Sequence, residues 1–293
     1  IVPESRRNEI LSLLDQGLED VSFSRPRKEG SVGIPVPGDD SQVMYVWCDA
    51  LSNYITALGY GQDDTLYKKF WPVDVHVIGK DILRFHAAIW PGMLLSAGLT
   101  LPKSILVHGF ITSGGKKMSK TLGNVIDPVA LLKEYGTDAV RYYLARHISP
   151  FEDGDLTMEG FKDVYNGELA NGLGNVVSRV MQMANKYLDG PVDLSDRRPP
   201  LSINTQMDKF GVHDALGAIW SDLSVIDGLI QEEKPFEVAK TDMEKAKLRV
   251  THYVKELSRI AELLNIFLPE TAEKIHQAIR ENKKPENLFA RKD

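Results

Sequence analysis

A segment rich in lysine, glycine and hydroxyl residues occupies positions 114–124, with the sequence Gly-Gly-Lys-Lys-Met-Ser-Lys-Thr-Leu-Gly-Asn. Lysine ammonium groups are compact, mobile charges that bind phosphate oxygens, and glycine permits backbone conformations with positive φ. Hydroxyls and backbone N–H groups can complete an anion site around them. This segment, here called the lysine loop, therefore predicts a clamp on a phosphate group. A charged, solvated turn is the alternative that the lysines alone leave open.

Two further pairs of residues have the spacing of a binding surface. Trp47 and Tyr54 are seven residues apart, and Ile82 and His86 are four apart, so each pair shares one face if its segment is helical. Such a face could hold an apolar ligand and give it a polar contact. Taken alone, however, paired aromatics usually belong to a core, and a lone histidine on an apolar face is usually a satisfied core residue.

The elements that would position these residues alternate between strand and helix. The apolar, β-branched run at 73–78 predicts a strand that stops at Gly79. Apolar spacing at 81–97 predicts a helix, and the run at 104–111 predicts a second strand. Ligands of such sheets bind beyond the carboxyl ends of the strands. Because residues 79–81 and the lysine loop both follow such ends, they could face one pocket.

The remainder of the chain has the pattern of helices. Asp127-Pro128 supplies a helix cap and a first-turn proline, and Gly136 ends that helix. Helical spacing of apolar residues continues at 137–146, 157–188, 207–231 and 243–267 and after Pro269. We therefore expect an α/β segment at 1–112, the lysine loop with connecting helices at 113–155, and a helix bundle at 156–293.

Composition limits the class of protein. With 293 residues, of which 43% are hydrophobic and 26% charged, the chain can bury a sizeable core. One cysteine, Cys48, excludes an intrachain disulfide and a cysteine-rich zinc site within these residues, which favours a reducing compartment and predicts the cytoplasm. No apolar run is long enough to span a membrane. The formal charge of -6 means that a nucleic acid would need a local basic surface.

Several segments together resemble the methionyl-tRNA synthetases, a family of class I aminoacyl-tRNA synthetases. These segments are Tyr45-Val46-Trp47-Cys48-Asp49-Ala50, Ile78-Gly79-Lys80-Asp81-Ile82, Phe85-His86, His108-Gly109-Phe110 and the lysine loop, followed by the helical tail. The leucyl-, isoleucyl- and valyl-tRNA synthetases have a loop similar to the lysine loop. Trp47 with Asp49-Ala50, and Asp81 with Phe85-His86, favour the methionyl enzymes over them. A synthetase for another apolar amino acid and a non-catalytic tRNA-binding module are the alternatives.

The resemblance implies a fold, a reaction and a set of site residues. The fold is the second half of a Rossmann-type nucleotide-binding domain followed by an all-α anticodon-binding bundle. The reaction activates L-methionine with ATP and Mg²⁺ and transfers it to tRNA(Met), with Lys117, Lys120 and Ser119 in the catalytic loop. The implied methionine site is Trp47, Ala50, Tyr54, Ile82 and His86. The implied ATP site is Arg25, Gly79, Lys80, Asp81, His108, Gly109, Lys117, Met118 and Lys120, and the implied anticodon site is Asn175, Arg179 and Phe236.

Two departures from the family pattern shape these expectations. The family usually has tryptophan where Phe236 stands, so base stacking there would involve a smaller ring. No His-x-Gly-His segment occurs, although the family carries this first signature loop in the preceding half of the nucleotide-binding fold. We therefore expect the chain to be a carboxyl-terminal portion that alone neither adenylates methionine nor binds ATP tightly. The zinc-bearing insertion of many family members would also belong to the preceding part, and we expect no metal site within this chain.

Overall fold

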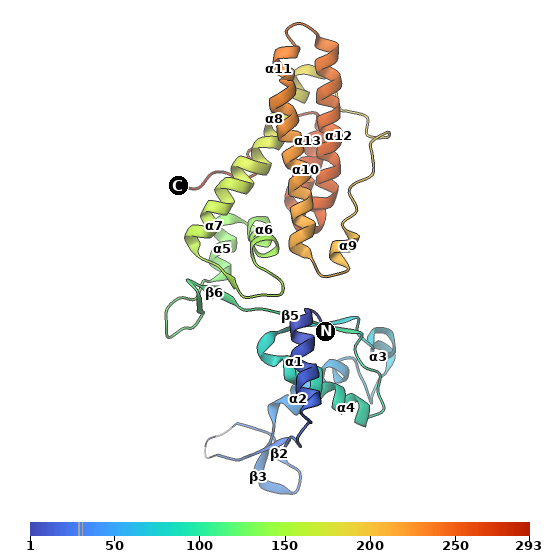
Figure 1. Cartoon of the computed structure of the whole chain (residues 1–293), viewed down its shortest axis with the longest axis vertical. Helices are drawn as coiled ribbons and strands as arrows, with labels where there is room; N and C mark the ends of the chain where they lie inside the picture. Colours follow the sequence, from blue (N-terminus) through green and yellow to red (C-terminus); the bar gives the residue numbers. More distant parts are fainter. Residues whose placement is uncertain (29, 31) are drawn as a thin grey trace. The chain divides into compact units, whose positions relative to one another are not determined.

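The computed structural model describes residues 1–28, 30 and 32–293, and these form two compact units, Ile1–Phe110 and Ile111–Asp293 (Figure 1). The first unit holds the predicted α/β elements. The second begins just before the lysine loop and contains the helical tail. The expected three-part division at residues 112 and 155 stays a prediction.

Two parallel strands form the centre of the first unit. β4 (Val75–Gly79) pairs with β5 (Ser104–His108) in parallel, with Gly79 opposite His108. Val2 adds an isolated parallel bridge at Leu106. The two predicted strands are therefore present, and their carboxyl ends meet at Gly79 and His108. The second ends earlier than the expected residue 111, because Ile111 starts a separate strand in the other unit.

The connection between these strands is helical but irregular. A 3₁₀ turn spans Lys80–Ile82, a π-helix spans Phe85–Ile89, and α4 spans Trp90–Ser96. The regular helix predicted over 81–97 is thus divided into three. Pro91 offers a reason, because it lacks an N–H for the α-helical ladder and its ring crowds the preceding turn. Widened π-turns are frequent at functional sites.

Further elements of the first unit surround this centre. α2 (Val46–Thr56) buries Leu51 and Ile55 in a small core with Trp71, Trp90 and Leu94. An antiparallel sheet of the strands β1 (Ser24–Pro26), β3 (Asp39–Met44) and β2 (Pro35–Val36), in that order, precedes α2 and was not predicted. The remaining bounds are α1 (Glu4–Asp15) and α3 (Thr65–Phe70).

The second unit opens with a small sheet that carries the lysine loop. β6 (Ile111–Ser113) pairs antiparallel with β7 (Lys116–Lys117) and parallel with β8 (Gly154–Asp155). α5 (Pro128–Tyr135) and α6 (Thr137–His147) lie between β7 and β8 in the chain. The predicted cap is confirmed, since the Asp127 side chain accepts a hydrogen bond from the Val129 amide.

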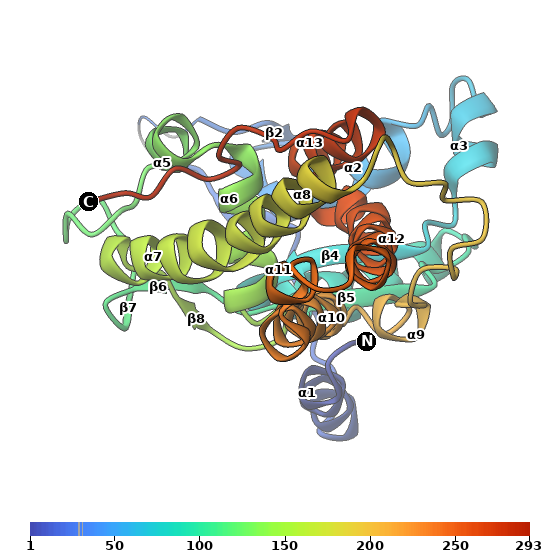
Figure 2. The ribbon, with the colours of Figure 1, turned by 90° about the horizontal axis from the view of Figure 1, so that it is seen from above.

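Helices build the rest of the second unit. α7 (Met158–Val164), a π-helix (Tyr165–Gly174) and α8 (Asn175–Tyr187) follow one another as a continuous rod (Figure 2). α12 (Met243–Phe267) packs against α8, α10 (Val212–Glu233) and α13 (Pro269–Glu281), and one large apolar core runs between them. The short helices α9 (Asn204–Met207) and α11 (Pro235–Val238) flank α10. The predicted bundle is confirmed. In the described part of the chain, no helix combines the length and apolarity that crossing a membrane requires.

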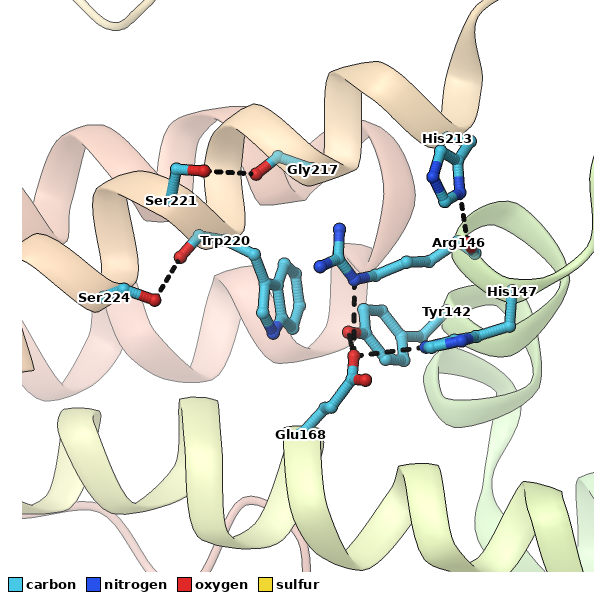
Figure 3. A network of polar contacts seen from close by, with 9 residues as sticks. All are labelled: Tyr142, Arg146, His147, Glu168, His213, Gly217, Trp220, Ser221 and Ser224. Carbon is cyan, nitrogen blue, oxygen red and sulfur yellow. Dashed lines mark hydrogen bonds and ion pairs between the residues drawn. The ribbon is translucent and has the colours of Figure 1, made fainter.

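A polar network joins α6 to the bundle (Figure 3). The Glu168 carboxylate in the second π-helix accepts hydrogen bonds from Tyr142 and from Arg146 and His147, all three on α6. Arg146 also lies over the Trp220 ring of α10, 5.5 Å from its centroid. These contacts fix the connecting helices that follow the lysine loop to the helices of the tail.

Candidate functional site

An aromatic cluster in the first unit contains the two predicted residue pairs. Trp47 and Tyr54 both come from α2, and their ring centroids lie 6.0 and 5.6 Å from that of His86, which follows β4. The Trp47 ring also stacks on Phe85 at 4.1 Å. The π-helix places Phe85 and His86 next to each other on the side that faces α2. The predicted sharing of one helix face by Trp47 and Tyr54 is therefore confirmed.

Two hydrogen bonds fix the tautomer of neutral His86. Its Nδ1 lies 3.0 Å from the carbonyl oxygen of Ile82, which can only accept, so Nδ1 carries the hydrogen. Nε2 then accepts from the Tyr54 hydroxyl at 2.9 Å. Burial lowers the pKa of His86, although the Ile82 carbonyl acts in the opposite direction. The side chain is 1% exposed. The cluster thus presents aromatic surface and no charge.

His76 and Trp90 complete this cluster and were not predicted as site residues. The Trp90 indole donates to His76 Nε2 at 3.2 Å, and the Tyr54 and His76 rings lie 4.4 Å apart. Burial, with a smaller effect of His86, lowers the pKa of His76 to about 4. Its position inside the apolar strand β4 was the only sequence signal, since the alternation of a strand places His76 and Ile78 on the same buried face.

The other two residues predicted to bind methionine are Ala50, on α2, and Ile82, at the end of the 3₁₀ turn. Ala50 is exposed on α2 and lies between Trp47 and Tyr54 in helical spacing. Ile82 is partly buried, and its carbonyl orients His86. Tyr54 keeps 37% of its surface exposed, so this aromatic face remains accessible. Trp47, Tyr54 and Ile82 therefore all contact His86, and Ala50 lies on the helix that carries the first two.

A second group of predicted residues meets at the carboxyl ends of β4 and β5. A Cβ at Gly79 would lie 2.8 Å from a carboxylate oxygen of Asp81 and 3.7 Å from the His108 ring, so Gly79, Asp81 and His108 are in close contact. Asp81 lies within the 3₁₀ turn, and Gly79 occupies the position that precedes this turn. His108 donates from Nδ1 to the Gly109 carbonyl at 2.8 Å. Lys80 lies over the Phe110 ring.

Arg25 is fixed on β1. Its Nη1 donates to the carbonyl oxygens of Ser22 and Ser24, and its guanidinium lies 3.8 Å from the centroid of the Tyr45 ring. Tyr45 in turn lies beside Phe85, with their ring centroids 6.4 Å apart. Arg25 is thus connected through Tyr45 to the aromatic cluster.

The lysine loop belongs to the second unit. Lys116, Lys117 and Lys120 are exposed, whereas Met118 and Ser119 are partly buried. The Leu122 amide bonds to both the carbonyl and the hydroxyl of Ser119, which gives the loop a tight turn after Lys120. The three lysines of the loop are therefore exposed, while the Ser119 hydroxyl accepts a hydrogen bond from the loop backbone. That this loop and residues 79–81 face one pocket stays a prediction.

The predicted anticodon residues lie on α8 and α11. Asn175 is exposed and Arg179 follows it by one turn, so they share a helix face as expected. Arg179 forms an ion pair with Asp227 of α10. Phe236 is 45% exposed. A hollow of about 230 Å³ is lined by Arg179, Gln182, Met183, Lys186, Tyr187, Ile230 and Phe236.

Asn175 lines a different hollow. This one has a volume of about 380 Å³ and is lined by Ala170, Asn171, Gly174, Asn175, Ser178, Asn287, Leu288, Phe289 and Arg291. Gln182 and Lys186 continue the row of Asn175 and Arg179 along α8 and were not predicted. Their spacing of three and four residues was the available signal, because such a polar row marks the outer face of an amphipathic helix.

Comparison with known proteins gives consistent results. The family described as tRNA synthetases class I (M) matches residues 2–181. The chain is similar to "Methionine--tRNA ligase" of Clostridium acetobutylicum, at 46% identity over 94% of this chain and 45% of that protein. It is also similar to the protein of that name from Rhizobium meliloti, at 42% identity over 94% of this chain and 56% of that protein.

Solved structures agree with the sequence matches. Mycobacterium tuberculosis methionyl-tRNA synthetase bound by methionyl-adenylate has a TM-score of 0.85 and 34% identity, covering 99% of this chain and 64% of that chain. The apo form of the same enzyme has a TM-score of 0.82 and 33% identity over 100% of this chain and 64% of that chain. The chain spans about half the length of the curated relatives it matches. On this evidence, the chain belongs to the methionyl family of class I tRNA synthetases.

Proposed function

We propose that the protein carrying this chain activates L-methionine with ATP to methionyl-adenylate and transfers the methionyl group to tRNA(Met). The observation that carries this proposal is the uncharged aromatic cluster of Trp47, Tyr54 and His86. It is supported by relatives named methionine–tRNA ligase and by a similar structure titled as bound by methionyl-adenylate.

Methionine would be selected by shape and by contact of its sulfur with aromatic rings. Thioether–aromatic contacts contribute roughly 0.3–1.5 kcal/mol each. The Tyr54–His86 hydrogen bond already uses the hydroxyl proton and the Nε2 lone pair, so the face offers no charge to a polar side chain. A leucine, isoleucine or valine side chain would lose the sulfur contact, while a charged one would meet a desolvated surface without a partner.

ATP activation would use the lysine loop. A methionine carboxylate oxygen attacks the α-phosphorus, the bond to the bridging oxygen breaks, and pyrophosphate leaves with the bond electrons. Negative charge spreads over the phosphate oxygens during this step, so positioned ammonium groups accelerate it more than a general base would. Lys117 and Lys120 are proposed to supply this charge, Ser119 to support the loop, and Gly79, Asp81 and His108-Gly109 to receive the nucleoside.

Mg²⁺ and tRNA are the further partners of the proposed reaction. Mg²⁺ would accompany the triphosphate, because this cation keeps several of its waters and commonly binds together with substrate phosphates. A tRNA anticodon would contact the α8 face, with Arg179 and Phe236 lining one hollow that could accept a splayed base. We place this activity in the cytoplasm, as the single cysteine suggests.

Amino-acid-dependent exchange between ATP and labelled pyrophosphate tests the proposal on the complete encoded protein. We expect exchange with methionine and at least tenfold less with leucine, isoleucine or valine at equal concentration, since an apolar pocket discriminates by about 10–200-fold. Preference for another of these amino acids would assign a different synthetase. Binding of tRNA without any exchange would indicate a non-catalytic RNA-binding module.

A further inference from the structure

We propose that Asn124 and Asp155 are positioning residues that hold the lysine loop in the shape needed for adenylation. This inference rests on the proposed function and assigns the two residues no contact with ATP. They act on the loop from two sides: Asn124 bonds to three backbone groups, and Asp155 bonds to the Gly115 amide and to the Thr112 hydroxyl.

Asn124 closes the loop from its carboxyl-terminal end. Its Oδ1 accepts from the Ser119 amide at 2.9 Å, while its Nδ2 donates to the carbonyl of Lys117 at 3.3 Å and toward that of Ser113 at 3.5 Å. One partly buried side chain thus bridges both arms of the loop. The peptide groups on either side of Met118 are fixed by it, and these groups determine where the backbones of Lys117 and Lys120 lie.

Asp155 holds the opposite end of the same segment. Gly114 and Gly115 have φ values of 61° and 71° and join the paired residues Ser113 and Lys116, which is the geometry of a two-residue type I′ hairpin turn. The Asp155 carboxylate accepts from the Gly115 amide at 2.9 Å and from the Thr112 hydroxyl at 2.7 Å.

The charge state of Asp155 agrees with this role. Hydrogen bonds from the Gly115 amide and the Thr112 hydroxyl lower the pKa of Asp155, against a smaller effect of desolvation. The carboxylate therefore stays ionised and accepting at neutral pH. Its sequence separation of 40 residues from Gly115 means that the turn is fixed by β8 and not only by its own glycines.

The arrangement separates two tasks within one loop. The side chains of Lys116, Lys117 and Lys120 are exposed, whereas backbone groups of the loop are hydrogen-bonded to Asn124 and Asp155. A misplacement of about 1 Å at a reacting group can cost roughly 100-fold in rate. A loosened backbone should therefore slow adenylation while leaving the methionine pocket, which lies in the other unit, unaffected.

Three variants of the complete protein test the proposal by pre-steady-state adenylation. Asn124→Ala and Asp155→Ala should each lower the adenylation rate by at least about 10-fold, with the KM for methionine within about twofold of wild type. Asp155→Asn retains the accepting oxygen and should keep most of the rate. Transfer of methionine to tRNA from preformed methionyl-adenylate should remain unchanged in all three.

A matched control is Asp127→Ala, which removes the cap of α5 three residues beyond Asn124. It should leave the adenylation rate unchanged. Amide hydrogen exchange provides a readout independent of activity: the Ser119 amide should exchange faster in Asn124→Ala and the Gly115 amide in Asp155→Ala, but neither in Asp127→Ala.

The outcomes separate this inference from the proposed function. Wild-type adenylation rates in Asn124→Ala and Asp155→Ala would overturn the positioning role, whether or not amide exchange changes. Equal slowing in Asp127→Ala would also overturn it, because general destabilisation would then explain the loss. Absence of methionine-dependent pyrophosphate exchange in the wild-type protein would instead refute the proposed function, on which the positioning role of Asn124 and Asp155 rests.

Discussion

At the scale of single residues, the aromatic cluster depends on histidines that stay neutral. His86 donates from Nδ1 to the Ile82 carbonyl, and in its neutral form it accepts at Nε2 from the Tyr54 hydroxyl. His76 must accept at Nε2, because the Trp90 indole can only donate to it. Burial reinforces both, since a charged imidazole in this apolar site would lack solvation.

Stability of the first unit should consequently depend on pH. The folded pKa of His76 is about 4 against an ordinary 6.5, so its stabilising effect is present above about pH 6.5 and is lost as the pH falls from 6.5 to 4. Each unit of pKa corresponds to about 1.4 kcal/mol, which gives an upper bound of roughly 3–4 kcal/mol for this residue. His76→Gln keeps an acceptor for Trp90 but cannot titrate.

Urea unfolding at several pH values measures this effect. Between pH 6.5 and 4, the free energy of unfolding should fall less steeply in His76→Gln than in wild type. Some pH dependence should remain in the variant, because burial also lowers the pKa of His86. His252→Gln, at an exposed position on α12, is the control and should retain the wild-type slope. Identical slopes in His76→Gln and wild type would contradict the assignment.

The loop lysines give a prediction about catalysis. Lys120→Ala should lower the adenylation rate by roughly 100–1,000-fold, the usual effect of removing one group that stabilises transition-state charge. Binding of methionine should change little, because its proposed contacts are in the first unit. Rapid-quench measurement of methionyl-adenylate formation checks this. Lys116→Ala, at another exposed lysine of the loop, should have a much smaller effect, and an unchanged rate in Lys120→Ala would remove that residue from the mechanism.

At the scale of elements, Glu168 is the junction between the connecting helices and the bundle. It lies in a π-helix, and three side chains of α6 donate to it. Burial raises its pKa, but hydrogen bonds from His147 and Tyr142 and the nearby charges outweigh this effect and lower the pKa to about 2. Arg141 adds a second connection, since it donates to the carbonyls of Phe267 and Ile266 at the end of α12.

Glu168→Gln should destabilise the second unit by about 1–2 kcal/mol, because Arg146 and His147 lose a charged acceptor. The effect is moderate because the Glu168 side chain is 34% exposed. The ionised carboxylate stabilises the fold above about pH 4.5, and this is lost as the pH falls from 4.5 to about 2. The difference between variant and wild type should therefore shrink in acid.

Chemical unfolding at pH 7 and at pH 3 measures the two differences. Asp163→Asn removes an exposed carboxylate from α7 and serves as the control, with little expected change at either pH. A difference between Glu168→Gln and wild type that is constant across this range would show that the charge of Glu168 is not responsible.

At the scale of the whole molecule, the two units divide the proposed work. The first contains the residues proposed to bind methionine and the nucleoside, and the second contains both the lysine loop and the proposed anticodon surface. The Glu168 network and the Arg141 contacts link α6, which follows the loop, to helices that carry or support that surface. The lysine loop and the proposed anticodon surface therefore belong to one compact unit.

Phe236 tests the RNA-binding role. Phe236→Ala should raise the KM for tRNA(Met) about 5–100-fold, because stacking on a base contributes roughly 1–3 kcal/mol. Phe236→Trp should lower it, since the ring is 45% exposed and a larger ring can be accommodated. Aminoacylation kinetics with varied tRNA provide the measurement, and methionine-dependent pyrophosphate exchange should be unchanged in both variants.

Leu248→Ala is the matched control, since it shortens another exposed apolar side chain, 72% exposed, on α12. It should not alter the KM for tRNA. The effect of Phe236→Ala should also disappear with a tRNA whose anticodon bases are changed. If the loss persists with such a tRNA, Phe236 does not contact the anticodon.

The sequence alone determined the features that depend on local pattern. Helical spacing located the bundle, and Asp127-Pro128 located a cap, because both follow from contacts within a few residues. Trp47 and Tyr54 were correctly placed on one face for the same reason. The types of residue in the lysine loop suggested its chemistry without any structure.

Only the tertiary structure decided which distant residues meet. The stacking of Phe85 on Trp47, the contact of His76 with Tyr54, and the bond from Gly115 to Asp155 have no local signature. The Arg179–Asp227 pair likewise joins two helices. Such contacts arise when buried faces pack and their polar groups must find partners, and the periodicity of one segment does not specify its neighbour.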